Sequence, residues 1–218
     1  IGVFDSGVGG LSVLKELQTT LPNENFVFLA DQLYVPYGEK TQEELRGLVF
    51  KITDYFIKKH KIKMMVVACN TATCNVLADL RKKYSLPIVG TVPAIKPAAR
   101  ASKSKTVAII CTPSTSKSKV LDDLIRDHCK DVHILNIGCK NLENVVEKGE
   151  LDSIESQTLL LKYLADVVAS QADHLVLGCT HYPFLKKSIR KIVGSQVTLI
   201  DSGRAIARHT KSLLQKHF

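Results

Sequence analysis

The sequence predicts an α/β fold made of two similar parallel-sheet domains, of the doubly wound, flavodoxin-like type, that face each other across a cleft. Short apolar runs alternate with amphipathic stretches along the chain, a rhythm typical of parallel sheets covered by helices. The 218 residues are enough for one large domain or two small ones. Residues 91–99 carry two prolines and separate two stretches with the same rhythm.

The first stretch is predicted to contain four buried strands and three helices. Each strand prediction rests on a short apolar run, and each helix prediction on apolar residues at helical spacing. The strands are expected at residues 1–4, 26–30, 64–68 and 87–89, and the helices at 10–20, 41–60 and 73–84.

The second stretch repeats this order. Its strands are expected at residues 106–110, 132–137, 174–177 and 197–200, and its helices at 116–128, 142–148, 151–171 and 183–193. We expect residues 1–95 together with 208–218 to form the first domain, and residues 96–207 to form the second.

Composition narrows the class of protein. An apolar content of 45% and a charged content of 23% are ordinary for a globular chain. No apolar run approaches the roughly 20 residues that span a bilayer, so no membrane association is expected. No signal peptide precedes the first predicted strand, which favours a cytoplasmic location with reduced thiols. The six cysteines include no pair separated by only two residues, so we expect no metal site.

The net charge of +9 raises nucleic-acid binding as an alternative. The basic excess is spread over both halves, and its short clusters lie where helix ends are expected. Solvated helix faces therefore explain it better than a binding stripe. A basic protein that binds nucleic acid or another partner without catalysis stays open as an alternative, and so does a homodimer.

Two cysteines stand out because each follows a predicted buried strand. Cys69 follows residues 64–68, and Cys179 follows residues 174–177. The carboxyl ends of parallel strands are where ligands bind. Two thiols brought to one small molecule from opposite sides could remove and return a proton, which would invert a stereocentre. A free thiol has a pKa of about 8.5, so modest help makes a thiolate available near neutrality.

Polar residues near these cysteines are candidates to assist them. His181 lies two residues after Cys179 and is the expected acid/base or orienting group. Asp5 could assist Cys69 if the first and third strands are neighbours. The other four cysteines are expected to be buried core residues. Short donors and acceptors that could hold amino and carboxylate groups are Asn70, Thr71, Thr115 and Thr180.

The glycine-rich run from Asp5 to Gly10 is not a nucleotide-binding loop. A dinucleotide fingerprint would need glycine where the chain has Ser12, and the lysine of a phosphate-binding loop is absent. We expect a tight strand-to-helix turn whose backbone amides can bind a carboxylate.

Four motifs in order give the chain a resemblance to bacterial glutamate racemases of the aspartate/glutamate racemase superfamily. They are Asp5-Ser6-Gly7-Val8-Gly9-Gly10-Leu11, Pro36-Tyr37-Gly38, Cys69-Asn70-Thr71-Ala72 and Leu177-Gly178-Cys179-Thr180-His181-Tyr182-Pro183. Aspartate racemases are similar in fold but commonly place Glu after Cys-Thr, where this chain has His181. A racemase of another amino acid, such as aspartate, stays the enzymatic alternative.

The resemblance implies cofactor-independent interconversion of L- and D-glutamate by a two-base 1,1-proton transfer, which supplies D-glutamate for peptidoglycan and so for cell shape. It implies that Cys69 acts on D-glutamate with help from Asp5. It implies likewise that Cys179 acts on L-glutamate with help from His181 and Glu147. The substrate would be held by Asp5, Ser6, Pro36, Tyr37, Gly38, Cys69, Asn70, Thr71, Thr115, Cys179, Thr180 and His181.

Overall fold

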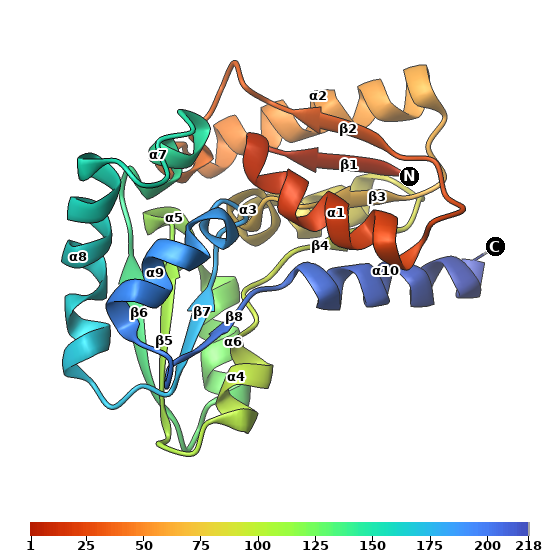
Figure 1. Ribbon diagram of the computed structural model, residues 1–218. Coiled ribbons are helices and arrows are strands. Elements are labelled where there is room, and N and C mark those ends of the chain that lie inside the picture. Colours follow the sequence, from red (N-terminus) through yellow and green to blue (C-terminus); the bar gives the residue numbers. More distant parts are fainter. Residues whose placement is uncertain (218) are drawn as a thin grey trace. The chain divides into compact units, whose positions relative to one another are not determined.

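The computed structural model describes residues 1–217, which form two compact units (Figure 1). The first unit contains Ile1–Val92 and the C-terminal residues from Ser202 onward, and the second contains Pro93–Asp201. The division expected from the sequence places both boundaries a few residues later. The second boundary cannot fall at 207, because residues 203–207 belong to a helix that continues to residue 217.

The first unit is built on a four-stranded parallel sheet with the order β2-β1-β3-β4. The strands are β1 (Gly2–Asp5), β2 (Val27–Ala30), β3 (Met65–Val67) and β4 (Ile88–Gly90). The helices are α1 (Leu11–Thr20), α2 (Gln42–His60), α3 (Asn70–Lys83) and α10 (Gly203–His217), with 3₁₀ turns η1 (Val8–Gly10) and η2 (Tyr37–Glu39).

Alternate strand residues cover the two faces of this sheet, as the period of two in a strand requires. Phe4 and Val67 point into a core with side chains of α2 and α3. Val3 and Val66 point the other way, into a core with side chains of α1 and α10. The sheet is therefore buried on both faces, which is typical of parallel sheets.

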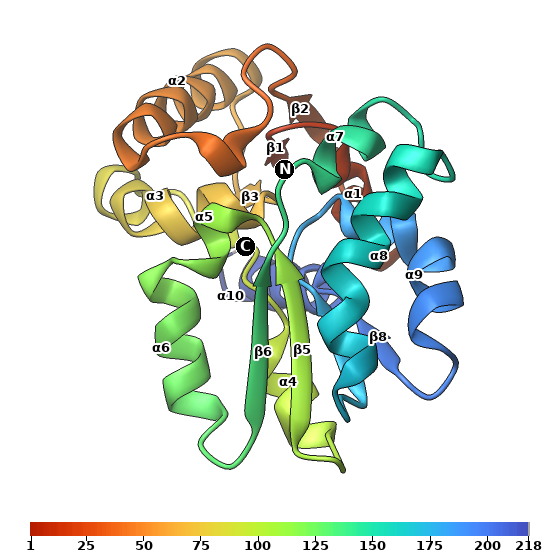
Figure 2. The same cartoon turned by 90° about the vertical axis from the view of Figure 1, so that its left-hand side faces the viewer.

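The second unit repeats the sheet with the order β6-β5-β7-β8, again fully parallel. Its strands are β5 (Thr106–Cys111), β6 (His133–Gly138), β7 (His174–Leu177) and β8 (Thr198–Ile200). Its helices include α6 (Lys119–His128) and α8 (Ile154–Ala169), which lie on opposite sides of β5 and β6 (Figure 2). The others are α4 (Ile95–Ala101), α5 (Pro113–Ser116), α7 (Leu142–Glu147) and α9 (Lys186–Val193), with the 3₁₀ turn η3 (Tyr182–Leu185).

All eight predicted strands are present, but two helices were not predicted. Helix α4 begins inside the segment that the sequence marked as a domain connection, because Pro97 occupies its first turn. Proline is tolerated there, since the first helical N–H groups have no partner within the helix. The C-terminal helix α10 was likewise missed. Of residues 116–128, predicted as one helix, Ser116 ends α5 and residues 119–128 form α6, with Ser118 between them as the cap of α6.

No helix among residues 1–217 combines the length and apolar character needed to cross a membrane.

Candidate active site

The two cysteines singled out in the sequence follow equivalent strands of the two sheets. Cys69 follows β3 and Cys179 follows β7, and each of these strands is the neighbour of the first strand of its unit. We call the groups around Cys69 the first half-site and those around Cys179 the second half-site, and describe each within its own unit.

Asp5 is the last residue of β1 and is fully buried in the first half-site. The Asp5 carboxylate accepts a hydrogen bond of 2.6 Å from the backbone N–H of Gly10. A Cβ atom at position 10 would lie 2.5 Å from the Asp5 Cβ, so only glycine allows this approach. The sequence predicted that backbone amides of the glycine turn can bind a carboxylate. In the structure the Gly10 amide binds the carboxylate of Asp5, which belongs to the chain itself.

Cys69 lies beside Asp5 because β1 and β3 are parallel neighbours, with Phe4 opposite Val67. Cys69 is the N-cap of the 14-residue helix α3, and its Sγ accepts from the Ala72 N–H at 3.5 Å. The Sγ also lies 3.6 Å from the Ser6 Oγ. The sequence placed the start of this helix at residue 73, so the capping role of the cysteine is a finding of the structure. A helix N-terminus favours a negative charge at this position.

Burial has the larger effect on Cys69, which is only 4% exposed. Loss of solvation and the negative charge of Asp5 raise the pKa of the thiol to about 12, against the opposing hydrogen bonds from Ala72 and Ser6. Without a substrate, Cys69 is therefore a protonated thiol at neutral pH, which is the state that can deliver a proton.

The other predicted residues of the first half-site are also buried, except Pro36, which is half-buried. Asn70 donates from its Nδ2 to the Thr91 carbonyl at 3.0 Å, and Thr71 is 3% exposed. The 3₁₀ turn η2, which contains Tyr37 and Gly38, packs against α3. Pro36 immediately precedes this turn and is its N-cap.

Tyr37 lies in the same core cluster as Cys69. Its hydroxyl donates to the Asp31 carboxylate at 2.6 Å. Burial, then this hydrogen bond and the charge of Asp31, raise the pKa of the Tyr37 phenol far above its usual range. The side chain therefore stays neutral and its proton is directed to Asp31.

The second half-site contains a row of three side chains: a thiol, an imidazole and a carboxylate. Cys179 follows β7 after a single glycine, and its Sγ lies 3.6 Å from the His181 Nδ1. The His181 Nε2 lies 2.5 Å from an oxygen of Glu147, the last residue of α7. Cys179 and His181 are 6% and 2% exposed, so the row is almost completely desolvated. The predicted proximity of His181 to Cys179 is present within this unit, and Glu147 contacts His181.

This arrangement lets His181 exchange a proton with Cys179. When Nε2–H donates to Glu147, the Nδ1 of a neutral ring carries a lone pair that can accept the thiol proton. The carboxylate then stabilises the imidazolium and fixes its orientation. Around Cys69 the described residues 1–217 show no such row: its Sγ contacts the Ser6 hydroxyl and the Ala72 N–H. Conversely, Cys179 does not cap an α-helix, since the turn after it is η3 with no side-chain cap.

Two threonines of the second unit were also predicted as site residues. Thr115 is fully buried on α5, where the Thr112 hydroxyl accepts from its N–H at 3.3 Å and donates to its Oγ1 at 3.1 Å. Thr180 follows Cys179 and is 5% exposed. Both positions were predicted from the sequence as substrate contacts, and that role stays a prediction.

Sequence reasoning assigned no role to two further residues of this region, Glu143 and Tyr182. Glu143 is 4% exposed and Tyr182 is fully buried, although both are polar. The signal for Glu143 was its spacing of four residues from Glu147, which sets both carboxylates on one face of α7. Within residues 1–217, no group of three or more His, Cys, Asp or Glu side chains is arranged to hold a metal ion.

Comparison with known proteins identifies the family to which the chain belongs. The sequence profile of the Asp/Glu/Hydantoin racemase family matches residues 1–210. The chain belongs to this family. It is 45% identical over 218 residues to the glutamate racemase of Deinococcus radiodurans, with 99% of this chain and 75% of that protein covered.

Solved structures of family members agree with this assignment. The crystal structure of Escherichia coli glutamate racemase, in complex with L-glutamate and the activator UDP-MurNAc-ala, superimposes with a TM-score of 0.91 at 35% identity. That match covers 98% of this chain and 82% of the other. The aspartate racemase of Picrophilus torridus, at 18% identity and a TM-score of 0.69 over 99% of this chain and 94% of its own, shares the fold alone.

Proposed function

We propose that this family member is a glutamate racemase, which interconverts L- and D-glutamate by moving the α-proton without an organic cofactor or a metal. The observation that carries the proposal is the presence of a buried cysteine at the same strand end of both units, each with its own acid/base assistance. Relatives at about 45% identity that are named glutamate racemases favour glutamate over other amino acids.

In the proposed reaction the two half-sites take opposite faces of one α-carbon. The Cys179 thiolate removes the proton of L-glutamate, and the electron pair spreads into the α-carboxylate. The Cys69 thiol then delivers its proton to the other face, which gives D-glutamate and leaves Cys179 protonated and Cys69 as the thiolate. The reverse reaction exchanges the roles. The high pKa of Cys69 suits the donor role in the first direction.

The assisting groups have distinct tasks in this scheme. His181 and Glu147 hold the proton that Cys179 releases before it reacts. Asp5, held by the Gly10 amide, faces Cys69 and the ammonium group of the substrate. Short donors stabilise the carboxylates, including the one that gains charge during the reaction. We assign this binding to Ser6, Pro36, Tyr37, Gly38, Asn70, Thr71, Thr115 and Thr180.

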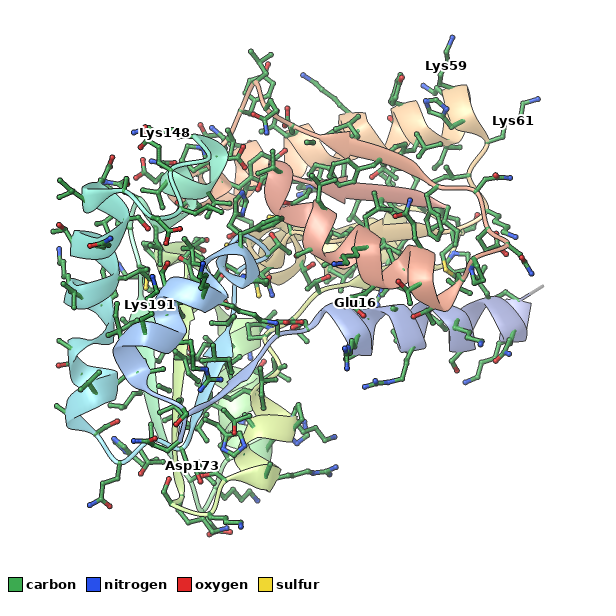
Figure 3. All side chains as sticks on the ribbon, in the orientation of Figure 1. Glu16, Lys59, Lys61, Lys148, Asp173 and Lys191 are labelled. Carbon is green, nitrogen blue, oxygen red and sulfur yellow. The ribbon has the colours of Figure 1, made fainter. Side chains whose placement is uncertain are left out.

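Binding of nucleic acid without catalysis is the alternative of a different class. Figure 3 shows Lys59 and Lys61 extending outward at the end of α2, while Lys191 lies on α9 of the other unit. These basic side chains end separate helices, as solvated faces do. Charge-driven binding would weaken steeply with salt, whereas racemisation would depend on the two cysteines.

Exchange of the α-proton in heavy water tests the proposal. We expect the protein, without added pyridoxal phosphate, to racemise both enantiomers of glutamate and to incorporate deuterium at the α-carbon, as followed by proton NMR and circular dichroism. Cys69→Ser and Cys179→Ser should each lose nearly all racemisation, while Cys129→Ser, at a core thiol, should retain it. Near-normal turnover in either of the first two variants would contradict the two-base scheme. Faster turnover of aspartate than of glutamate would contradict the choice of substrate.

We further propose that the enzyme works in the cytoplasm and supplies D-glutamate for peptidoglycan. Association into a homodimer stays a prediction, which analytical ultracentrifugation would check.

A further inference from the structure

Helix α8 exposes a regular row of apolar side chains to solvent. Ile154, Leu161 and Val168 are 85%, 58% and 56% exposed, and they recur every seven residues. Thr158 and Ala165, which are also exposed, lie between them. We call these five residues the α8 seam. Single exposed apolar residues are common, but a contiguous row of them usually marks an interaction surface.

The α8 seam is separate from the face that α8 uses to fold. The buried residues of α8 lie on its other side; they are Ser156, Leu160, Leu164 and Val167. Figure 2 shows the helix lying alongside the sheet of the second unit. The Thr158 hydroxyl donates to the Ile154 carbonyl at 2.8 Å within the helix. Thr158 therefore already has a partner for its polar group and can offer its methyl group to another surface.

The spacing of the α8 seam is that of a coiled-coil helix. The steps from residue 154 to residue 168 are four, three, four and three residues, as between the a and d positions of a heptad repeat. Large side chains (Ile, Leu and Val) alternate with small ones (Thr and Ala) along the row. Such a helix packs well against a second helix that places a large side chain opposite each small one.

A second copy of α8 that runs antiparallel to the first provides this arrangement. When Leu161 faces the partner's Thr158, two-fold symmetry places Thr158 opposite the partner's Leu161. In the same register Ile154 faces the partner's Ala165, and Ala165 faces the partner's Ile154. Each of these four layers then pairs one large side chain with one small side chain.

The charges beside the α8 seam are complementary in the same register. Glu155 and Lys162 are seven residues apart and therefore lie on the same side of the helix. The two-fold axis brings Glu155 to within about 3 Å, measured along the helix axis, of the partner's Lys162, and it forms this pair twice. Within the chain, Glu155 pairs with Lys148 at 3.5 Å through one carboxylate oxygen. Asp166 lies farther round the helix from the seam.

We propose that the α8 seam is the contact of a two-fold homodimer in which the α8 helices of two copies pack antiparallel. This assembly does not depend on the proposed racemase activity. A helix of 16 residues is about 24 Å long, so the contact is smaller than the roughly 800 Å² per partner of a standard interface. The dimer should therefore be weak and should dissociate on dilution.

Reversal of the flanking charges tests the register, with sedimentation velocity across the micromolar range as the assay. Glu155→Lys and Lys162→Glu should each raise the dissociation constant of the dimer by about tenfold or more, because each places two pairs of like charges across the two-fold axis. A mixture of the two variants should form a heterodimer with the wild-type affinity, because both pairs then have opposite charges. Mixing cannot repair a defect inside one chain, so this recovery is specific to a contact between copies.

Leu161→Gln tests the apolar layers. It should weaken the dimer by at least about tenfold, and circular dichroism should show an unchanged fold, because the side chain is exposed and its replacement leaves no cavity. Matched controls are Lys59→Glu and Glu43→Lys, which reverse exposed charges on α2 in the first unit. Both controls should leave the dissociation constant unchanged.

A wild-type protein that stays monomeric throughout this range would overturn the inference. A dimer that survives both charge variants and Leu161→Gln would overturn it too, and would place the homodimer contact on another surface. Loss of the dimer in both charge variants without recovery on mixing would refute the register. Racemisation, measured in the same samples, reports on the proposed function alone: recovery on mixing in a protein that does not racemise glutamate would support the α8 seam and contradict that function.

Discussion

Replacement of Asp5 by Asn should make the Cys69 thiol more acidic and the enzyme slower. Adjacent parallel strands lie about 4.8 Å apart, and the register of β1 and β3, continued by one residue, sets Asp5 beside Ala68. The Asp5 and Cys69 charges are then roughly 6–7 Å apart, and at an effective dielectric constant of about 20 they repel by roughly 2–3 kcal/mol. Since one pKa unit corresponds to about 1.4 kcal/mol, this repulsion accounts for between one and two units.

The pKa of Cys69 should therefore fall from about 12 to between about 10 and 11 in the Asn variant. Burial still holds it above an ordinary thiol, because loss of solvation is the larger cause. The retained amide oxygen can accept from Gly10, so the turn should keep its conformation. Below its pKa, the thiolate fraction rises about tenfold for each unit that the pKa falls.

Alkylation by iodoacetamide at pH 8.5 checks this without exposing the protein to extreme pH. The rate at Cys69, followed by mass spectrometry, should rise at least about tenfold in Asp5→Asn, with Cys74 of the same helix as reference. Racemisation should nonetheless fall by about 100-fold or more, because a positioned acid/base group contributes on this scale. An unchanged or slower alkylation would refute the electrostatic reasoning, and full racemisation would refute the role of Asp5.

Two predictions concern stability. The pKa of Asp173 is lowered, because hydrogen bonds from His174 and from neighbouring serine and backbone donors outweigh the opposing effect of burial. A carboxyl with a lowered pKa in the folded state stabilises the protein at pH values above its ordinary pKa near 4, and this stabilisation is lost as the pH falls below that value. Asp173→Asn should therefore lower the free energy of unfolding in urea by about 1–3 kcal/mol at pH 7. The same substitution should make the free energy of unfolding decline less steeply in acid. Ser118, whose Oγ accepts from the Leu121 N–H at 3.2 Å, caps α6. Ser118→Ala should cost about 1 kcal/mol in the same assay and Ser118→Gly only a few tenths; equal losses would contradict the capping role.

Local patterns were enough to predict the strands and the second half-site's central contacts. Apolar runs are a strong signal for buried parallel strands, and all eight were found. His181 could be assigned to Cys179 because the two are only two positions apart in the sequence. The neighbour relation of β1 and β3 was a condition in the sequence argument, and the sheet order fulfils it. Helix α4 was missed because Pro97 reads as a breaker unless the helix start is known.

Contacts between segments that are far apart in the sequence could not be predicted from local sequence patterns. Glu147 lies 34 residues from His181, and nothing local indicates that the end of the predicted helix at 142–148 contacts His181. The resemblance alone pointed to Glu147. Glu143 and Tyr182 had no such pointer, since a glutamate on a short helix and a tyrosine in a turn are usually exposed or structural. Their burial depends on how α7 packs on η3, which no local pattern shows.

The two half-sites share a scaffold but differ in their electrostatics, and this difference suits a racemase. Cys69 caps a long helix beside a carboxylate, whereas Cys179 is coupled to an imidazole and a second carboxylate. L- and D-glutamate have equal free energies in water, so kcat/KM must be the same in both directions whatever the residues do. The asymmetry can therefore appear only in kcat and KM separately. In the proposed reaction it would instead set which of the two sulfurs carries the proton before substrate binds, a preference that two identical half-sites would lack.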